Sequence, residues 1–289
     1  MSTLTKNATP SQPTAAASTA HTPSERSGRE GARRSGGITT AYVGLELKRV
    51  TRDLVTMFFV AGLPAFFFLL FGAAAGYSKE VAGNGNVAMY IMISMAAYGA
   101  VTATVGIGGM AAVERMQGWG RQLGLTPLRD GSYVAMKAIV ALAIAIIPIA
   151  LVYVLGMFTG SEGTLTAWLG SAAILIVGAV MFSLYGLIFG LAFRSEAAVS
   201  AASGSLVVLG FLGNIFFPLT GWMLELARFT PLYGYVQLAR YPLTEGQVID
   251  TEGNLSQEAL WMPLANVAVW TVILAALATW LVRRSRGRQ

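Results

Sequence analysis

The sequence contains no cysteine, one histidine and few charged residues, which make up 12% of its 289 positions. Without cysteine it has neither a disulfide framework nor a cysteine-ligated metal site. The histidine, His21, lies in a polar N-terminal stretch, so the apolar part of the chain offers no histidine base or metal ligand. We therefore expect no catalytic residue and no metal site. The hydrophobic content of 55% and the mean hydropathy of +0.60 indicate a polytopic membrane protein.

Two further absences concern the source of energy. No Asp, Glu, Lys or Arg lies inside the long apolar runs, whereas ion-coupled carriers usually keep one at a cost of about 2.5–3.5 kcal/mol. There is no G-x-x-x-x-G-K-[ST] loop, because none of the four lysines follows a glycine. An enzyme is the least expected class, since no nucleophile–base pair can be placed at membrane depth. If the chain does uphill work, ATP and Mg²⁺ must bind to another polypeptide.

The N-terminal part divides into a tail and a helix. Residues 1–37 are rich in Ser, Thr, Ala, Pro and Gly, and we expect a disordered cytoplasmic tail before a membrane domain at 38–289. Residues 38–53 predict an amphipathic helix on the membrane surface, with Tyr42 and Leu45 at helical spacing. Its basic side chains, which can reach lipid phosphates, are Lys48, Arg49 and Arg52.

Six charge-free segments of about 20 residues or more are long enough to span a bilayer as helices. They are residues 54–76, 87–113, 138–159, 165–193, 197–221 and 259–282. The fold class is therefore all-α, with six transmembrane helices. Small residues at helix-packing spacing occur in three pairs: Gly72 and Gly76, Gly156 and Gly160, and Gly186 and Gly190. Between the fifth and sixth segments, MLELARF and LYGYVQLARY predict short outer helices that are interfacial or re-entrant.

The positive charges predict the orientation. Seventeen of the 20 Lys and Arg residues fall on the side that holds both termini, and Lys79, Arg228 and Arg240 fall on the other. The 14 acidic residues divide evenly, so the two sides carry net charges of +10 and −4. By the positive-inside rule we expect both termini in the cytoplasm of a plasma-membrane protein. Because the basic residues are distributed by membrane side and not gathered in a patch on a folded face, we expect no nucleic-acid partner.

Glu114 to Leu128, read ERMQGWGRQLGLTPL, is the longest charged, amphipathic piece between two apolar runs. One helical face holds Met116, Trp119 and Leu123, and the other is charged. Thr126-Pro127 ends the helix, because proline cannot continue it. Such a helix suits the cytoplasmic membrane surface as a docking site for a motor protein, or as an ordinary interfacial loop.

The intramembrane polar residues are few. Asn214 lies among phenylalanines in GFLGNIFFPL, and either lines an apolar substrate path or makes an interhelical hydrogen bond of about 0.6–2 kcal/mol. The residues that we expect on such a path, from the second and fifth segments, are Met95, Thr102, Phe211, Asn214 and Phe217.

Three stretches resemble the membrane-spanning permease subunits of type-2 ABC exporters. They are LELKRVTRDLVTMFFVAGLPAFFFLLFG, ERMQGWGRQLGLTPL and NIFFPLTGWMLELARFTPLYGYVQLAR, within a resemblance that covers most of residues 44–283. The second resembles the family's E-R-x-x-G-x-x-x-x-L-x-x-T-P-L loop, and departs from it at Met116, where the family often carries an acid. The resemblance implies that this loop is the helix contacting the ATPase, through Glu114, Arg115, Gly118, Trp119, Arg121, Leu123, Thr126 and Pro127.

The resemblance also implies the assembly and the activity. Two permeases, either identical or sisters, would join two cytosolic P-loop ATPase subunits in the membrane lipid. The substrate path would lie at the dimer interface, and an apolar, Phe- and Met-rich path suits a hydrophobic or amphipathic substrate such as a drug, antibiotic or lipid. Two alternatives stay open, a non-transporting membrane sensor or assembly subunit and a secondary carrier. An ATPase encoded beside this chain would favour the exporter.

Overall fold

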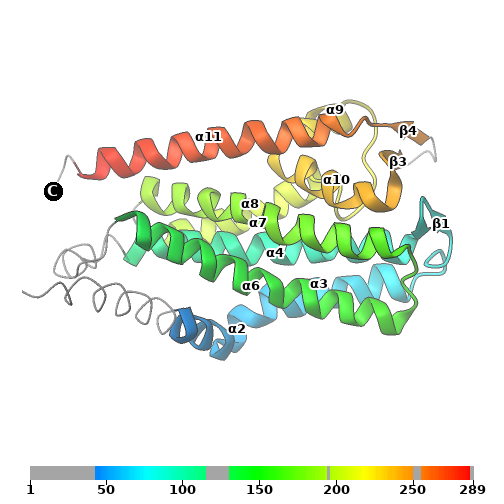
Figure 1. Cartoon of the computed structure of the whole chain (residues 1–289), viewed down its shortest axis with the longest axis horizontal. Coiled ribbons are helices and arrows are strands. Elements are labelled where there is room, and N and C mark those ends of the chain that lie inside the picture. The colour runs from blue at the N-terminus through cyan, green and yellow to red at the C-terminus, as the bar shows by residue number, and fades with distance from the viewer. Residues whose placement is uncertain (1–42, 115–129, 194–195, 250–254, 287–289) are drawn as a thin grey trace, which may run out of the picture. The chain divides into compact units, whose positions relative to one another are not determined.

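The computed structural model describes residues 43–114, 130–193, 196–249 and 255–286. All described residues belong to one compact unit, Thr39–Gln289. The predicted tail, residues 1–37, lies outside the described residues. The described part is mostly helical, and five of its helices are long and apolar enough to cross a membrane (Figure 1). This is the architecture of an all-α polytopic membrane protein.

The first apolar segment is helical over Leu54–Ala73, slightly less than predicted, and changes its winding along its length. It consists of α2 (Leu54–Met57), the π-helical η1 (Phe58–Gly62), α3 (Leu63–Phe67) and the π-helical η2 (Phe68–Ala73). Asp53 begins the segment as an N-cap, because its carboxylate accepts hydrogen bonds from the Thr56 amide at 3.2 Å and hydroxyl at 2.6 Å. Pro64 lacks an amide hydrogen and lies where η1 gives way to α3.

The central helix of the described part is α4 (Val87–Glu114), which matches the prediction within one residue. It packs against the other long helices, α6 (Asp130–Thr159), α7 (Leu165–Phe193) and the shorter α8 (Glu196–Leu212) (Figure 1). Of its apolar window, 83% is buried inside the protein, against 11% for α11 (Trp261–Arg286). α4 is therefore a protein-enclosed helix, and α11 presents most of its surface outward.

The crossing of α4 and α7 depends on glycine. A Cβ atom on Gly108 would lie 1.9 Å from the carbonyl oxygen of Ser183, and one on Gly186 would lie 2.0 Å from that of Val105. Of the six glycines predicted to pack, four meet close neighbours: Gly72, Gly156, Gly186 and Gly190. The prediction is wrong for Gly76 and Gly160, which have open space at the Cβ position among the described residues.

The fifth predicted span, residues 197–221, is not one helix. α8 ends at Leu212 after 17 residues, which at 1.5 Å per residue is about 25 Å, shorter than the roughly 30 Å of a bilayer core. An irregular stretch follows, and then the two short helices that the sequence predicts, α9 (Gly221–Arg228) and α10 (Pro231–Thr244). The six-span count therefore rests on five full-length helices and this shorter one.

Two strand pairs lie beside α10. One is β1 (Val81–Ala82) with β2 (Gly85–Asn86), and the other is β3 (Gln247–Ile249) with β4 (Leu255–Gln257). Asn84, in the first turn, donates its amide to the Leu243 carbonyl at 2.7 Å and its side chain to Glu245 at 2.8 Å. Leu243 and Glu245 lie at the C-terminal end of α10, and Asn84 lies three residues before α4. These bonds therefore connect the end of α10 to the start of α4.

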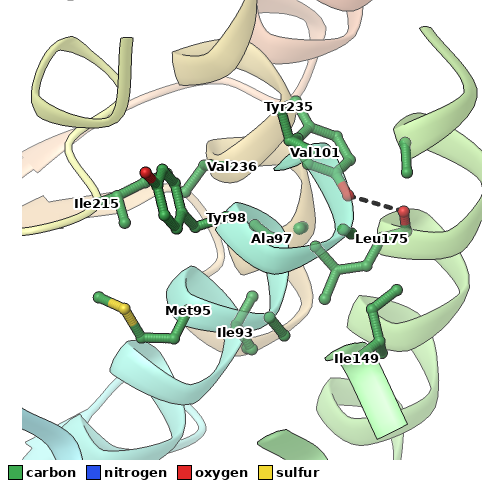
Figure 2. Close-up of a cluster of buried hydrophobic side chains, with 14 of the residues drawn as sticks. Ile93, Met95, Ala97, Tyr98, Val101, Ile149, Leu175, Ile215, Tyr235 and Val236 are labelled. Carbon is green, nitrogen blue, oxygen red and sulfur yellow. Dashed lines mark hydrogen bonds between the residues drawn. The ribbon is translucent and has the colours of Figure 1, made fainter. Parts of the chain in front are cut away.

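The hydrophobic core joins α4, α6, α7 and α10. Figure 2 shows Val101 of α4, Ile149 of α6, Leu175 of α7 and Tyr235 of α10 among the buried side chains of this cluster. The Tyr235 hydroxyl donates a hydrogen bond of 2.7 Å to the Leu175 carbonyl. The ring reaches this carbonyl because Gly178 has no side chain to obstruct it, a Cβ there lying 2.5 Å from the ring. α10 is thus part of the core rather than a loop on the surface.

Candidate functional site

The irregular stretch after α8 is organised by Asn214. Its backbone has φ of +57°, a conformation that asparagine tolerates better than most residues. Its side-chain oxygen accepts a hydrogen bond of 3.0 Å from the Leu219 amide, which closes the loop back on the helix end. Asn214 is 2% exposed, so this bond is protected from water. The sequence predicts Asn214 on a path or in an interhelical bond, and the structure uses it to end α8.

A buried arginine on α10 also binds the chain at Asn214. Arg240 of α10 donates from Nη2 to the Asn214 carbonyl at 2.8 Å and to Ser94 Oγ of α4 at 2.6 Å. Its guanidinium carbon lies 3.9 Å from the centre of the Tyr90 ring, also on α4. One side chain therefore joins α4, α10 and the end of α8. The sequence counts Arg240 only as an outer charge, and the structure corrects this, because the side chain is fully buried.

The charge of Arg240 is compensated in an unusual way. No carboxylate of the described residues lies within 4.0 Å of the guanidinium, and Nη1 has no hydrogen-bond partner there. Burial lowers the pKa of Arg240, although an arginine remains protonated in proteins. The compensating groups are the Tyr90 ring face, the Ser94 hydroxyl and the Asn214 carbonyl oxygen. Asn214 lies two residues beyond the end of α8, so the break after α8 supplies one of the acceptors that this charge needs.

Beside this joint lies an aromatic cluster of Phe67, Tyr98, Phe211, Phe216 and Phe217. Phe216 is in its middle, with its ring centre 5.2 Å from Tyr98 and 5.0 Å from Phe211. Phe211 in turn contacts Phe217 at 5.4 Å, and these two rings are 40% and 49% exposed. The cluster therefore has a buried side against α4 and an apolar side that faces outward from the chain.

The structure places three of the five predicted path residues together. Phe211, Asn214 and Phe217 lie at the break, whereas Met95 and Thr102 lie on α4, one turn to either side of Tyr98. Met95 is 1% exposed and packs in the core, so it does not line an open path in this structure. Thr102 is half-buried and donates its hydroxyl to the Tyr98 carbonyl at 2.8 Å. Their role as a path stays a prediction.

The N-terminal surface helix is observed over residues 43–52, within the predicted 38–53. Leu45 is 68% exposed, so it does not pack into the protein, and its contact with the membrane stays a prediction. Val43, Leu47 and Val50 form another face of the helix, which packs against a buried cluster of α4 and α6 residues. This protein-facing side was not predicted from the sequence. Lys48, Arg49 and Arg52 are exposed on the helix, as lipid contacts would require.

An ion pair connects this helix to the C-terminal end of α4. Arg49 Nη1 lies 3.6 Å from Oε1 of Glu114, the last residue of α4. Glu114 is only 9% exposed, which corrects its predicted place on a solvent-facing surface. The remaining predicted coupling residues, Arg115, Gly118, Trp119, Arg121, Leu123, Thr126 and Pro127, lie outside the described residues.

Two contacts at this site were not predicted from the sequence. One joins Tyr98 to Phe216, and the other joins Ser94 to Arg240. Tyr98 is three residues from Met95 and four from Thr102, so it shares their helical face and could have been included on that ground. Arg240 is the next-to-last residue of the aromatic stretch LYGYVQLARY, but its burial depends on partners 26 and 146 residues away. Among the described residues, no three His, Cys, Asp or Glu side chains are grouped to hold a metal ion.

The comparisons with known proteins point to transport. No protein-family model matches the chain. A protein of Bacillus subtilis (strain 168) named "Putative transport permease YvfS" is 23% identical over 195 residues, covering 66% of this chain and 79% of that protein. This distant similarity, together with the apolar helices, supports a membrane transport permease.

Proposed function

We propose that this chain is the transmembrane permease subunit of an ATP-driven, type-2 ABC exporter. The protein would move a hydrophobic or amphipathic molecule out of the cell, with both of its own termini in the cytoplasm of a plasma-membrane assembly. α8 and the irregular stretch after it would together make the fifth of six crossings. The distant permease relative and the E-R-x-x-G-x-x-x-x-L-x-x-T-P-L pattern after α4 support this proposal.

The observation that carries the proposal is the path of α4. This helix is continuous from Ser94, which binds Arg240, to Glu114, where the predicted ATPase-docking segment begins. Twenty residues at 1.5 Å each place these ends about 30 Å apart, the thickness of a bilayer core. Because α4 is enclosed by its neighbours, a displacement at its inner end is transmitted to the joint at the end of α8.

The energy and the partners follow from the same argument. The sequence has no P-loop, so ATP and Mg²⁺ would be held by a separate cytosolic ATPase subunit. A second permease copy or a sister permease would face the exposed side of the aromatic cluster, where Phe211 and Phe217 would meet an apolar substrate. The coupling would be mechanical, in that nucleotide closes the ATPases and the two permeases part.

The test is co-purification from the native membrane. The tagged chain, extracted in mild detergent, is expected to carry a P-loop ATPase identified by mass spectrometry, with measurable ATP hydrolysis. Arg121→Glu is expected to lose that ATPase, while Arg283→Glu, an exposed cation at the end of α11, keeps it. Arg121 is preferred over Glu114, since Glu114 is buried and paired with Arg49. Recovery of the chain alone in several detergents would favour a sensor or a secondary carrier.

A further inference from the structure

A cavity of about 240 Å³ lies at the junction of α9, α10 and the start of α11. This volume is below the roughly 300–1,000 Å³ of sites for drug-sized ligands, so it suits a small group rather than a whole drug. Its charged and aromatic lining residues are Glu225, Arg228, Phe229, Tyr233, Glu258 and Trp261. None of them belongs to the joint at Arg240 or to the aromatic cluster.

The polar groups of this cavity are held in fixed positions. Glu258, 4% exposed, accepts hydrogen bonds from the Tyr233 hydroxyl at 2.7 Å and from Arg228 Nε at 2.8 Å. Arg228 also pairs with Glu225. Burial lowers the pKa of Arg228, but its interactions with Glu258 and Tyr233 together raise the pKa above its ordinary value, so the guanidinium is firmly charged. Burial raises the pKa of Tyr233, so its phenol stays a neutral donor.

The lining is complementary to a cation. Two carboxylates oppose one guanidinium, which gives the lining a formal net charge of −1. Three aromatic residues, Phe229, Tyr233 and Trp261, contribute to the same wall. Alkylammonium groups are recognised by a carboxylate combined with aromatic ring faces. The ring faces attract such a cation because it is only weakly hydrated.

The surroundings of the cavity are apolar. Trp222 and Phe229 of the α9 region and Trp261 at the start of α11 are each at least two-thirds exposed. Exposed tryptophans of this kind are typical of a membrane–water interface, where a ligand with an apolar body can lie. The Trp270 indole donates to the Phe229 carbonyl at 2.8 Å, which fixes this edge of the cavity to α11.

We propose that this outer cavity binds the ammonium group of an amphipathic molecule, with the carboxylate of Glu258 and the rings of Phe229 and Trp261 as its contacts. The site is independent of the proposed export function, because it is formed by this chain alone. The ammonium group belongs either to a free amphipathic amine or to a lipid headgroup.

The test uses the purified full chain in nanodiscs of digalactosyldiacylglycerol, a lipid with neither net charge nor an ammonium group, and titrates hexyltrimethylammonium by calorimetry. An uncharged analogue with a tert-butyl group in place of trimethylammonium is the control ligand. The cation is expected to bind about ten-fold more tightly than this analogue. Glu258→Gln keeps an acceptor for Tyr233 and Arg228 and is expected to remove that preference, as is Trp261→Leu at an exposed position. Glu162→Gln, an exposed acid outside the cavity, is the matched control and is expected to change nothing.

A second arm identifies the source of the ammonium group. In nanodiscs of phosphatidylethanolamine, whose net charge is also zero, a lipid headgroup that occupies the cavity would compete and weaken binding of the probe several-fold, whereas equal binding in both discs supports a free amphipathic amine. Equal affinity for the cation and the uncharged analogue would overturn the proposal. So would a charge preference that survives both Glu258→Gln and Trp261→Leu, because the cavity would then be no more than the space around a structural ion pair.

Discussion

Arg240 Nη2 donates a hydrogen bond of 2.8 Å to the main-chain carbonyl of Asn214. This single bond connects α10 to the point where α8 ends. The same nitrogen also reaches Ser94 of α4, so three segments distant in sequence meet at one guanidinium. Arg240 is completely buried, so these bonds are shielded from water.

The first prediction concerns Ser94, the acceptor for two donors of Arg240. Ser94→Ala leaves Nε and one of the two N–H groups of Nη2 unpaired in the core, and is expected to lower the unfolding free energy by about 2 kcal/mol. The double change Ser94→Ala with Arg240→Met should cost about 1–2 kcal/mol less than the sum of the single changes. Unfolding in mixed micelles measures both. Ser183→Ala, whose hydroxyl bonds only within its own helix, is the control.

Asn214 offers a test of its backbone conformation. Asn214→Ala loses the bond to the Leu219 amide and forces a positive φ on alanine, which together should cost about 2–3 kcal/mol. Asn214→Gly loses the same bond without the strain and should cost about 1 kcal/mol less. Thermal unfolding of the two variants in one detergent gives the comparison. If glycine proves as costly as alanine, the positive φ carries no strain at this position.

The α4–α7 crossing can be tested with two glycines on one helix. A Cβ at Gly108 would overlap the Ser183 carbonyl, whereas a Cβ at Gly106 meets no atom within 4 Å among the described residues. Gly108→Ala should therefore destabilise by about 1–3 kcal/mol through overpacking. Gly106→Ala should be neutral, or stabilising by up to about 1 kcal/mol, because alanine favours the helix. The measurement is the unfolding temperature, and equal effects at both positions would contradict the packing.

The inner ion pair should be weak by itself. Arg49 is largely exposed, so Arg49→Ala is expected to cost less than about 1 kcal/mol. Glu114→Ala should cost more, because Glu114 is buried and has interactions beyond this pair. A double-mutant cycle on detergent-solubilised protein measures the coupling. A coupling well above 1 kcal/mol would show that the N-terminal surface helix is held more by this pair than by Val43, Leu47 and Val50.

The long helices could be predicted because their signal is local. α4 and α7 are charge-free runs closed by charged or turn residues, and their observed bounds agree with the predicted ones within one residue. Composition alone is enough for such segments, since a bilayer requires length and apolar character. The protein-facing side of the N-terminal surface helix could not be predicted, because it depends on contacts with α4 and α6.

The joint at Arg240 could not be predicted in the same way. Residues 197–221 read as one apolar run, and its break after Leu212 depends on bonds from Arg240 and from the Leu219 amide. A charge count places Arg240 on the outer side and cannot see that Ser94 and Tyr90 enclose it. Those partners are tertiary, and single-sequence periodicity carries no information about them.

The measurement that tests the central claim most directly is photo-crosslinking in living cells from position 119. A photoreactive amino acid replaces Trp119, within the segment that should dock the motor. The account predicts a covalent adduct with a P-loop ATPase, identified by mass spectrometry and absent when the same amino acid replaces the exposed outer residue Trp222. Crosslinks from position 119 to lipid alone, with no ATPase adduct, would contradict it.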